Sequence, residues 1–205
     1  MIGPTAHNPT ISNSAKYRPR RIQPFRQGDL DGLCGLYAII NAARVVCGRK
    51  LSDKRSRKLF EYLSQYTIKD RGNLNILTEG LCLCEMIKLM KELRGLLEDI
   101  YDLRLQAYRP WKGKAASKPS DEAILLELGG LLSNKHSAAI VGFDHPVMHW
   151  TTITGINQTQ AAIFDSGYLK NIDRELLSFQ KPKRKKSIAN DLWVATRQTI
   201  FVLKR

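Results

Sequence analysis

Residues 27–46 read QGDLDGLCGLYAIINAARVV, a turn-forming stretch followed directly by a long apolar run. Three glycines and two aspartates between Gln27 and Gly35 favour turns, and residues 36–46 are apolar on most sides. Cys47-Gly48 then supplies a typical helix stop. The stretch therefore predicts a turn and a buried helix over residues 36–46, with Cys34 at the junction between them.

Elsewhere the hydrophobic period divides the chain into a helical first half and a β second half. Helical spacing predicts further helices over about residues 53–66, 78–97 and 120–132. Alternation or β-branched and aromatic residues predict strands over residues 101–108, 138–143, 148–156, 160–164 and 192–203. This segregation indicates an α+β fold in which an N-terminal helical half packs on a C-terminal antiparallel β-sheet.

The chain has 205 residues, which is long enough for one domain with a hydrophobic core but short for two. Prolines interrupt residues 1–26, so we expect an irregular basic tail there and a single domain over residues 27–205. No apolar run approaches the roughly 18 residues of a membrane span, and the N-terminus lacks the apolar core of a signal peptide. We expect a cytoplasmic protein, or one secreted by a dedicated apparatus without a cleaved signal peptide.

The formal net charge is +14, from 33 basic and 19 acidic residues. Residues 1–28 and 180–190 each hold five basic and no acidic residues, so these two stretches carry ten of the fourteen net charges. Residues 16–26 and 181–186 could attract an acidic partner or nucleic acid, or they could simply be solvated segments. No aromatic or glycine-rich interleaving marks a nucleic-acid-binding module.

The cysteines lack the density of a disulfide scaffold, which favours a reduced, cytosolic setting. Cys82 and Cys84 stand in the apolar stretch 81–90, with no second Cys or His pair at a zinc-ligand spacing. We therefore expect both to be buried core thiols rather than metal ligands. No metal or other cofactor is expected.

Cys34 is the one cysteine at a turn-to-helix junction. Unpaired N–H groups and the positive end of the helix dipole at such a position stabilise a thiolate. The same N–H groups can hold the negative oxygen that develops when the thiolate attacks a carbonyl carbon. A structural thiol at a helix start is the alternative, and a base elsewhere in the chain has to decide between them.

The histidines are the candidate bases: His7, His136, His145 and His149. His149 begins one predicted strand, and Asp165 ends the next. A hairpin turn at residues 157–158 would bring His149 opposite position 166, within reach of the Asp165 carboxylate. The carboxylate could then accept a hydrogen bond from the imidazole and fix its tautomer. We therefore predict Cys34 as nucleophile, His149 as base and Asp165 as the group that orients the base, with His145 and His136 as fallback bases.

The motif over residues 27–38, with the later His149-Trp150 and the string 164–166 (FDS), resembles the papain-like cysteine peptidases. Within these it is most similar to the compact bacterial ones related to peptidases that remove double-glycine leaders. The likeness covers about residues 25–205, although only these short motifs are specific. It implies a papain-like catalytic domain over residues 27–205, a Cys-His-Asp triad, and a protein or peptide substrate.

In that family a glutamine shortly before the cysteine donates its side-chain amide to the oxyanion, which implies this role for Gln27. Gln27 precedes Cys34 by seven residues, one more than is usual in the family, so Gln23 or a backbone N–H are alternative donors. The string 31–34 (DGLC) is also similar to ovarian-tumour-type deubiquitinases, and the helix from Cys34 to Asn41 to Josephin-type ones. Both share the general fold.

The resemblance implies hydrolysis of a peptide or isopeptide bond through a thioester intermediate. Glutamine deamidation, transglutamination and N-acyl transfer are alternatives, since they differ in what leaves and what attacks rather than in the nucleophile. A basic nucleic-acid-binding adaptor with a degenerate papain-like core is the non-enzymatic alternative. The intact Cys, His and Asp count against it.

Overall fold

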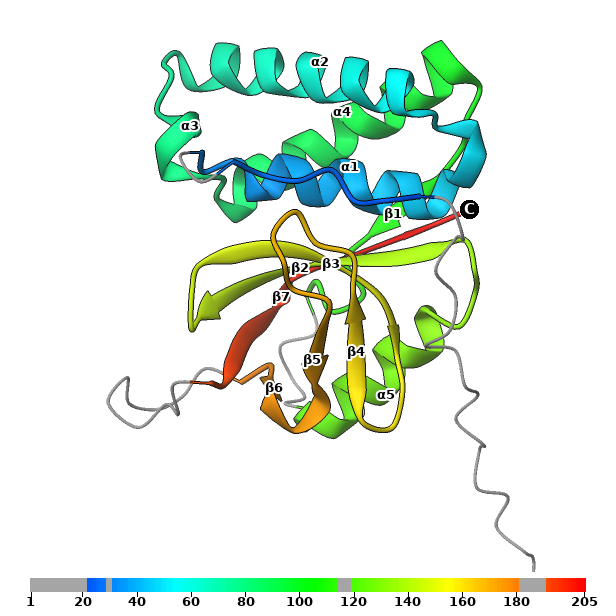
Figure 1. The fold of residues 1–205 in the computed structure, drawn as a ribbon, viewed down its shortest axis with the longest axis vertical. Helices are drawn as coiled ribbons and strands as arrows, with labels where there is room; N and C mark the ends of the chain where they lie inside the picture. The colour runs from blue at the N-terminus through cyan, green and yellow to red at the C-terminus, as the bar shows by residue number, and fades with distance from the viewer. Residues whose placement is uncertain (1–21, 29–30, 114–118, 181–190) are drawn as a thin grey trace, which may run out of the picture.

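The computed structural model describes residues 22–28, 31–113, 119–180 and 191–205. The helices are α1 (Cys34–Cys47), α2 (Asp53–Arg71), α3 (Ile76–Glu79), α4 (Leu83–Tyr101) and α5 (Asp121–Leu131). The strands are β1 (Gln106–Tyr108), β2 (Ser137–His145), β3 (His149–Ile156), β4 (Gln160–Ile163), β5 (Asn171–Asp173), β6 (Leu177–Ser178) and β7 (Trp193–Lys204). The predicted α+β fold is confirmed in its coarse form, because a helical N-terminal half lies against a C-terminal antiparallel sheet (Figure 1).

The sheet has the strand order β1-β7-β2-β3-β4-β5, and each of these neighbours is antiparallel. The short strand β6 pairs with β7 in parallel. Helices α1, α2 and α4 lie on one side of the sheet, and α5 lies against the other (Figure 1). In this order β2 lies between β7 and β3, and β3 carries His149.

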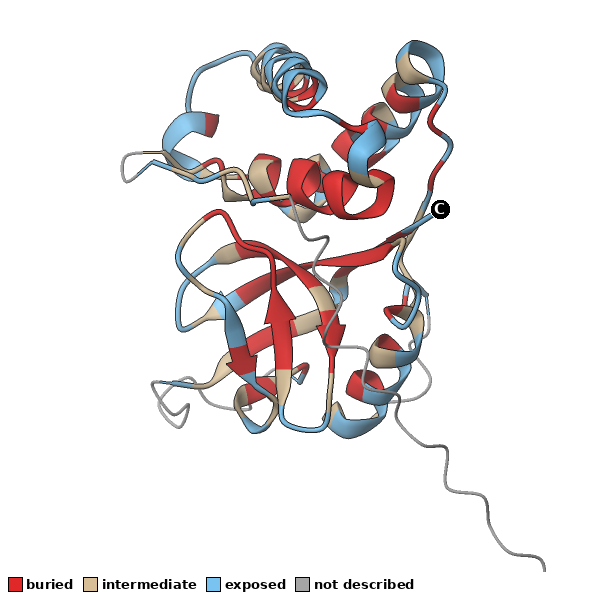
Figure 2. Ribbon diagram, turned by 45° about the vertical axis from the view of Figure 1, so that its right-hand side comes forward, coloured by how far each residue is buried: buried red, intermediate tan, exposed pale blue. Residues whose placement is uncertain are grey.

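Two hydrophobic cores lie on the two sides of the sheet, and β2 contributes side chains to both. Its residues Ala138 and Ile140 belong to the core under α1, whereas Ala139 and Val141 belong to the core over α5. Side chains alternate between the faces of a strand, so a strand covered on both faces is apolar throughout. Figure 2 shows the consequence as a band of buried residues through the sheet and the inner helix.

The chain joins the body earlier than the predicted start of the domain at residue 27. Residues 22–28 run alongside α1 (Figure 1), and Ile22 and Phe25 pack against the helical core. The fully buried Asn41 explains the docking, because its side chain accepts a hydrogen bond from Phe25 N (2.8 Å) and donates one to Phe25 O (3.2 Å). Residues 22–26 therefore pack on the domain and do not continue the tail.

The single helix predicted over residues 78–97 is wrong at its start. Gly80 has a φ of +72°, a conformation that side chains disfavour, and it separates α3 from α4. Cys82 is the N-cap of α4, and the Glu85 side chain accepts a hydrogen bond from Cys82 N at 2.8 Å. At the other end α4 continues to Tyr101, so the strand predicted over residues 101–108 shrinks to β1.

The prediction that Cys82 and Cys84 are buried core thiols is also wrong. Both residues are exposed, and a disulfide joins them. Cys84 lies on the same face of α4 as Ile87, Lys88 and Lys91, all of which are exposed. The buried face is formed instead by Met86, Leu89, Met90, Leu93 and Leu97.

Most of the two basic stretches, namely residues 16–21 and 181–186, lies outside the described residues, so their predicted partners are untested. Within the described ranges, none of the helices combines the length and the apolar composition that crossing a bilayer requires.

Candidate active site

Cys34 is the first residue of α1 and is partly exposed. Asp31 folds the preceding turn, because its carboxylate accepts hydrogen bonds from Gly28 N (2.9 Å) and Leu33 N (3.1 Å). Gly32 is required there, since a Cβ would lie 2.9 Å from Gly80 N. In the described part of the chain, no side chain caps the start of α1 at Leu33, so the first N–H groups of the helix remain available to a ligand.

The second half of the site lies on the sheet, where β3 begins and β4 ends. His149 Nε2 is 2.8 Å from Asp165 Oδ1. The Asp165 carboxylate also accepts hydrogen bonds from Thr151 Oγ1 (2.6 Å) and Gly167 N (2.8 Å). The side chains of His149 and Asp165 are only 17% and 3% exposed, so water competes little for these contacts.

The ionisation of the pair follows from these contacts. Burial lowers the pKa of His149, but hydrogen bonds with the side chains of Asp165 and Cys34, together with their charges, outweigh it and raise the pKa from 6.5 to about 9. Burial also acts to raise the pKa of Asp165, yet the hydrogen bond and charge of His149 bring it below its ordinary 3.8. At neutral pH the site holds an imidazolium against a carboxylate.

The hairpin that joins these residues differs in detail from the predicted one. Residues 157–159 connect the two strands, with Asn157 N donating to Gln160 O at 2.9 Å, where the prediction placed the turn at residues 157–158. Ile153 pairs with Ile163 and Ile156 with Ala161, one to two residues from the predicted register, and the β3–β4 ladder has an irregularity. The structure nevertheless brings Asp165 to His149.

Gln27 lies in the same cleft as Cys34, whereas Gln23 does not line it. Gln27 Nε2 donates to Asp31 O, and Ser166 Oγ donates to Gln27 Oε1 at 3.3 Å. Gln27 N also donates to Ser166 O at 3.0 Å. The predicted oxyanion residue is therefore tied both to the turn before Cys34 and to the residue after Asp165.

The cleft itself has a volume of about 500 Å³ and lies between the two halves of the molecule. The turn before α1 and residues 78–83 form one side, and residues 142–144, residues 148–150 and Thr199 form the other. Trp150 Nε1 donates to Leu81 O at 2.9 Å, and Thr152 Oγ1 donates to Ala38 O at 3.0 Å. The Thr152 bond ties α1 to β3, the strand that carries His149, and the Trp150 bond ties the cleft wall at Leu81 to the same strand.

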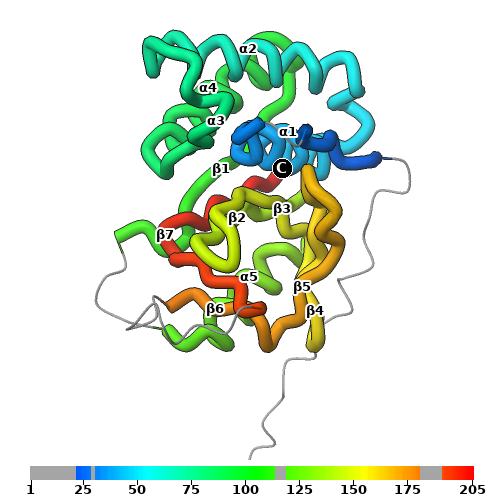
Figure 3. Tube along the Cα trace, turned by 60° about the vertical axis from the view of Figure 1, so that its left-hand side comes forward, coloured from blue at the N-terminus to red at the C-terminus, as the bar shows by residue number. Residues whose placement is uncertain are grey.

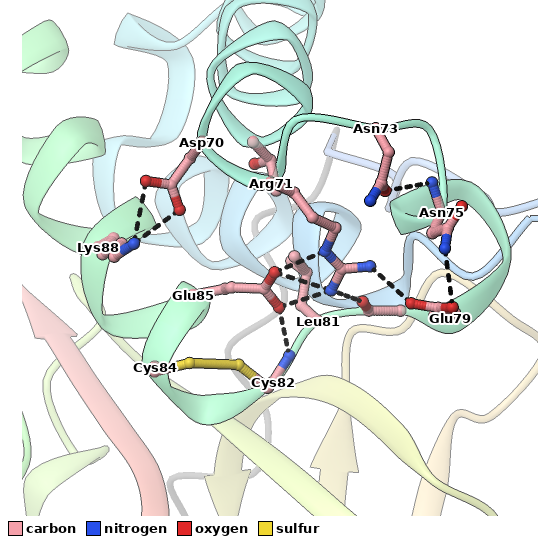
Figure 4. A network of polar contacts seen from close by, with 12 residues as sticks. Asp70, Arg71, Asn73, Asn75, Glu79, Leu81, Cys82, Cys84, Glu85 and Lys88 are labelled. Carbon is pink, nitrogen blue, oxygen red and sulfur yellow. Dashed lines mark hydrogen bonds and ion pairs between the residues drawn. A yellow bond between two sulfur atoms is a disulfide. The ribbon is translucent and has the colours of Figure 1, made fainter.

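Arg71, at the end of α2, fixes the wall of the cleft formed by residues 78–83. Its guanidinium donates two hydrogen bonds of 2.8 Å to Glu85 and one of 2.9 Å to Gly80 O, and it pairs with Glu79 at 3.3 Å. Figure 4 shows these contacts converging beside the Cys82–Cys84 disulfide. One largely covered cation thus holds both this wall and the start of α4.

The sequence reasoning missed Thr151, Ser166 and Arg71. The sequence gives a weak indication of Thr151, because residues 149 and 151 of a strand point to the same face. Ser166 acts through Gln27, 139 residues away in the sequence, and Arg71 acts through residues 8 to 14 positions away that it meets only because α2 and α4 pack together.

The fallback bases lie outside the cleft: His136 precedes β2 and His145 ends it. His7 lies outside the described residues. Among the residues that are described, no three or more His, Cys, Asp or Glu side chains gather as a metal site would require.

Comparison with protein-family models, curated proteins and solved structures finds no match for this chain. Any assignment of function therefore depends on the geometry of the site.

Proposed function

We propose that the protein is a papain-like cysteine peptidase, which hydrolyses a peptide or isopeptide bond with Cys34 as nucleophile. One observation carries the proposal: a cysteine at the start of a helix shares a cleft with a histidine that a buried aspartate holds. Nucleophile, base and orienting group each require such contacts, and together they define the constellation of a thiol hydrolase.

The reaction would proceed in two steps. The Cys34 thiolate attacks the carbonyl carbon and forms a C–S bond, and the His149 imidazolium gives its proton to the leaving amine as the C–N bond breaks. Water then attacks the thioester, with the neutral imidazole accepting its proton, and the acid leaves as the thiolate is restored. The raised pKa of His149 supports the first step, because the ring carries the proton that the amine needs.

The oxygen of the attacked carbonyl becomes negative and needs donors. The N–H groups at the start of α1 are suitably placed beside Cys34, and Gln27 Nε2 can add a second donor. An amide nitrogen carries two hydrogens, and one of those on Gln27 is engaged by Asp31 O, so the other can face the oxyanion.

Alkylation by iodoacetamide at pH 6, followed by peptide mapping, tests the nucleophile and its base. Ordinary thiols are protonated at this pH and react slowly, whereas a thiolate paired with an imidazolium reacts fast. We expect Cys34 to be labelled at least about tenfold faster in the wild type than in a His149→Ala variant. Cys47 is an internal control, because burial raises its pKa to about 11, and it should stay unlabelled.

A His145→Ala variant is the matched control, since this histidine is near in sequence but outside the cleft. It should label like the wild type. Equal labelling of Cys34 with and without His149 would contradict the proposal. Mass spectrometry of a peptide mixture incubated with the protein then separates the alternatives, because hydrolysis yields shorter peptides whereas deamidation and acyl transfer do not.

A further inference from the structure

A second hollow, of about 360 Å³, lies between α4 and the strands β1 and β7. Its apolar floor includes Met90 and Phe201, both buried, and the half-buried Ala107. Its lining residues include four cations and no carboxylate: Lys91, Arg94, Arg109 and Lys112. We call this hollow the basic groove.

The basic groove lies next to the cleft that holds Cys34. Leu83 lines the cleft and Ile87 the groove, one turn apart on α4, about 6 Å along the helix. Thr199 lines the cleft and Phe201 the groove, two residues apart on β7, about 7 Å along the strand. Figure 3 shows how close α4, β1 and β7 lie to one another, and residues of these three elements line the groove. A ligand leaving the cleft along α4 and β7 therefore meets the four cations within a few residues.

Three of the four cations of the groove face solvent instead of carboxylates of the protein. Lys91, Arg94 and Lys112 are exposed, and none of them takes part in an ion pair within the described residues. Arg109 is held in place by two hydrogen bonds to Gln198 O, at 3.0 and 2.7 Å. Like charges gathered without a partner repel one another, and an anionic ligand would relieve the repulsion.

We propose that the basic groove binds an acidic segment of the substrate polypeptide, a few residues from the bond that Cys34 attacks. In naming the ligand as substrate, the inference rests on the proposed function. An extended peptide turns alternate side chains to opposite faces, so apolar residues can cover the floor while carboxylates reach the rim. Nucleic acid fits less well, because Phe201 is buried and Lys204 lies over the Tyr108 ring, which disfavours stacking of bases on either.

Fluorescence anisotropy with the full chain carrying Cys34→Ala tests the binding without turnover. The probe is a fluorescein-labelled peptide in which glutamate alternates with small apolar residues, and the comparison is the same peptide with glutamine in place of glutamate. We expect the acidic peptide to bind about tenfold more tightly at low salt, which is the size expected of a few exposed ion pairs. The advantage should shrink as salt is added.

Two triple variants with the same change in net charge locate the site. Lys91→Gln/Arg94→Gln/Lys112→Gln should abolish the preference for glutamate, whereas Lys54→Gln/Lys58→Gln/Lys69→Gln, exposed on α2, should retain it. Equal loss in both triples, equal binding of the two peptides, or tighter groove-dependent binding of a single-stranded oligonucleotide would overturn the inference. Binding needs no nucleophile, so these outcomes are independent of the alkylation of Cys34 that tests the proposed function.

Discussion

The cleft and the basic groove, two neighbouring hollows that are both lined by α4 and β7, hold their charges in opposite ways. At the cleft Asp165 is buried, the His149 side chain is only 17% exposed, and the two are bonded to each other. In the groove Lys91, Arg94 and Lys112 are exposed, and within the described residues none forms an ion pair. Buried pairs fix geometry and are costly to break, whereas exposed charges act on a ligand and contribute little to the fold. The cleft thus has the charge arrangement that the proposed chemistry requires, and the groove the one that the proposed recognition requires.

The largest effect on stability is expected at the wall of the cleft. Arg71→Ala removes the cation that joins Glu85, Glu79 and Gly80 O, and the Glu85 side chain, 13% exposed, loses its partner. We expect the free energy of unfolding to fall by about 3 kcal/mol, as for other largely buried pairs. Urea denaturation measures it.

Arg104→Ala is the matched control. Arg104 pairs with Glu98 at 3.0 Å, but the side chains are 83% and 53% exposed. Loss of this pair should cost less than about 1 kcal/mol. An equal loss of unfolding free energy in Arg71→Ala and Arg104→Ala would contradict the contrast between largely buried and exposed ion pairs.

Next in size is the pH dependence of stability that His149 contributes. Its pKa is raised in the folded state from 6.5 to about 9, so the folded protein holds the proton more tightly than the unfolded chain. This contribution is complete below about pH 6.5 and is lost as the pH rises through about 9. We expect it to be about 2 kcal/mol, below the full value that the shift implies because the side chain keeps 17% exposure.

Urea denaturation between pH 6 and about 10 compares the wild type with His149→Gln. The wild-type free energy of unfolding should decline over this range relative to the variant. His136→Gln, which changes a histidine outside the cleft, should retain the wild-type decline. Parallel curves for the wild type and His149→Gln would contradict an imidazolium held by Asp165.

How far the sequence predicts this site depends on whether a contact is local. Cys34 at a helix start follows from a turn and an apolar run, and His149 near Asp165 follows from one hairpin, so an error of one or two residues in register did little harm. These three residues and Gln27 are brought together in the structure as expected.

What the sequence could not predict depends on distant partners or on a single backbone angle. The break at Gly80 turned one predicted helix into two, and with it Cys82 and Cys84 moved from the expected core to the surface. Hydrophobic composition alone does not say which face of an apolar stretch is buried. The basic groove was missed for a similar reason, because Lys91 on α4 and Arg109 after β1 meet only when the helix packs beside the sheet.

The smallest effect on stability is expected in the basic groove, and it sharpens the comparison most. Lys91→Gln/Arg94→Gln/Lys112→Gln should change the free energy of unfolding by less than about 0.5 kcal/mol, because exposed side chains without ion-pair partners among the described residues leave no charge stranded when they are replaced. A small gain in the free energy of unfolding fits this expectation as well as a small loss does, because the neighbouring like charges that are removed repel one another. Urea denaturation of this variant beside Arg71→Ala tests both the groove and the wall of the cleft. A loss as large as that of Arg71→Ala would mean that the groove cations hold the fold, which would leave their exposure and their lack of carboxylate partners unexplained.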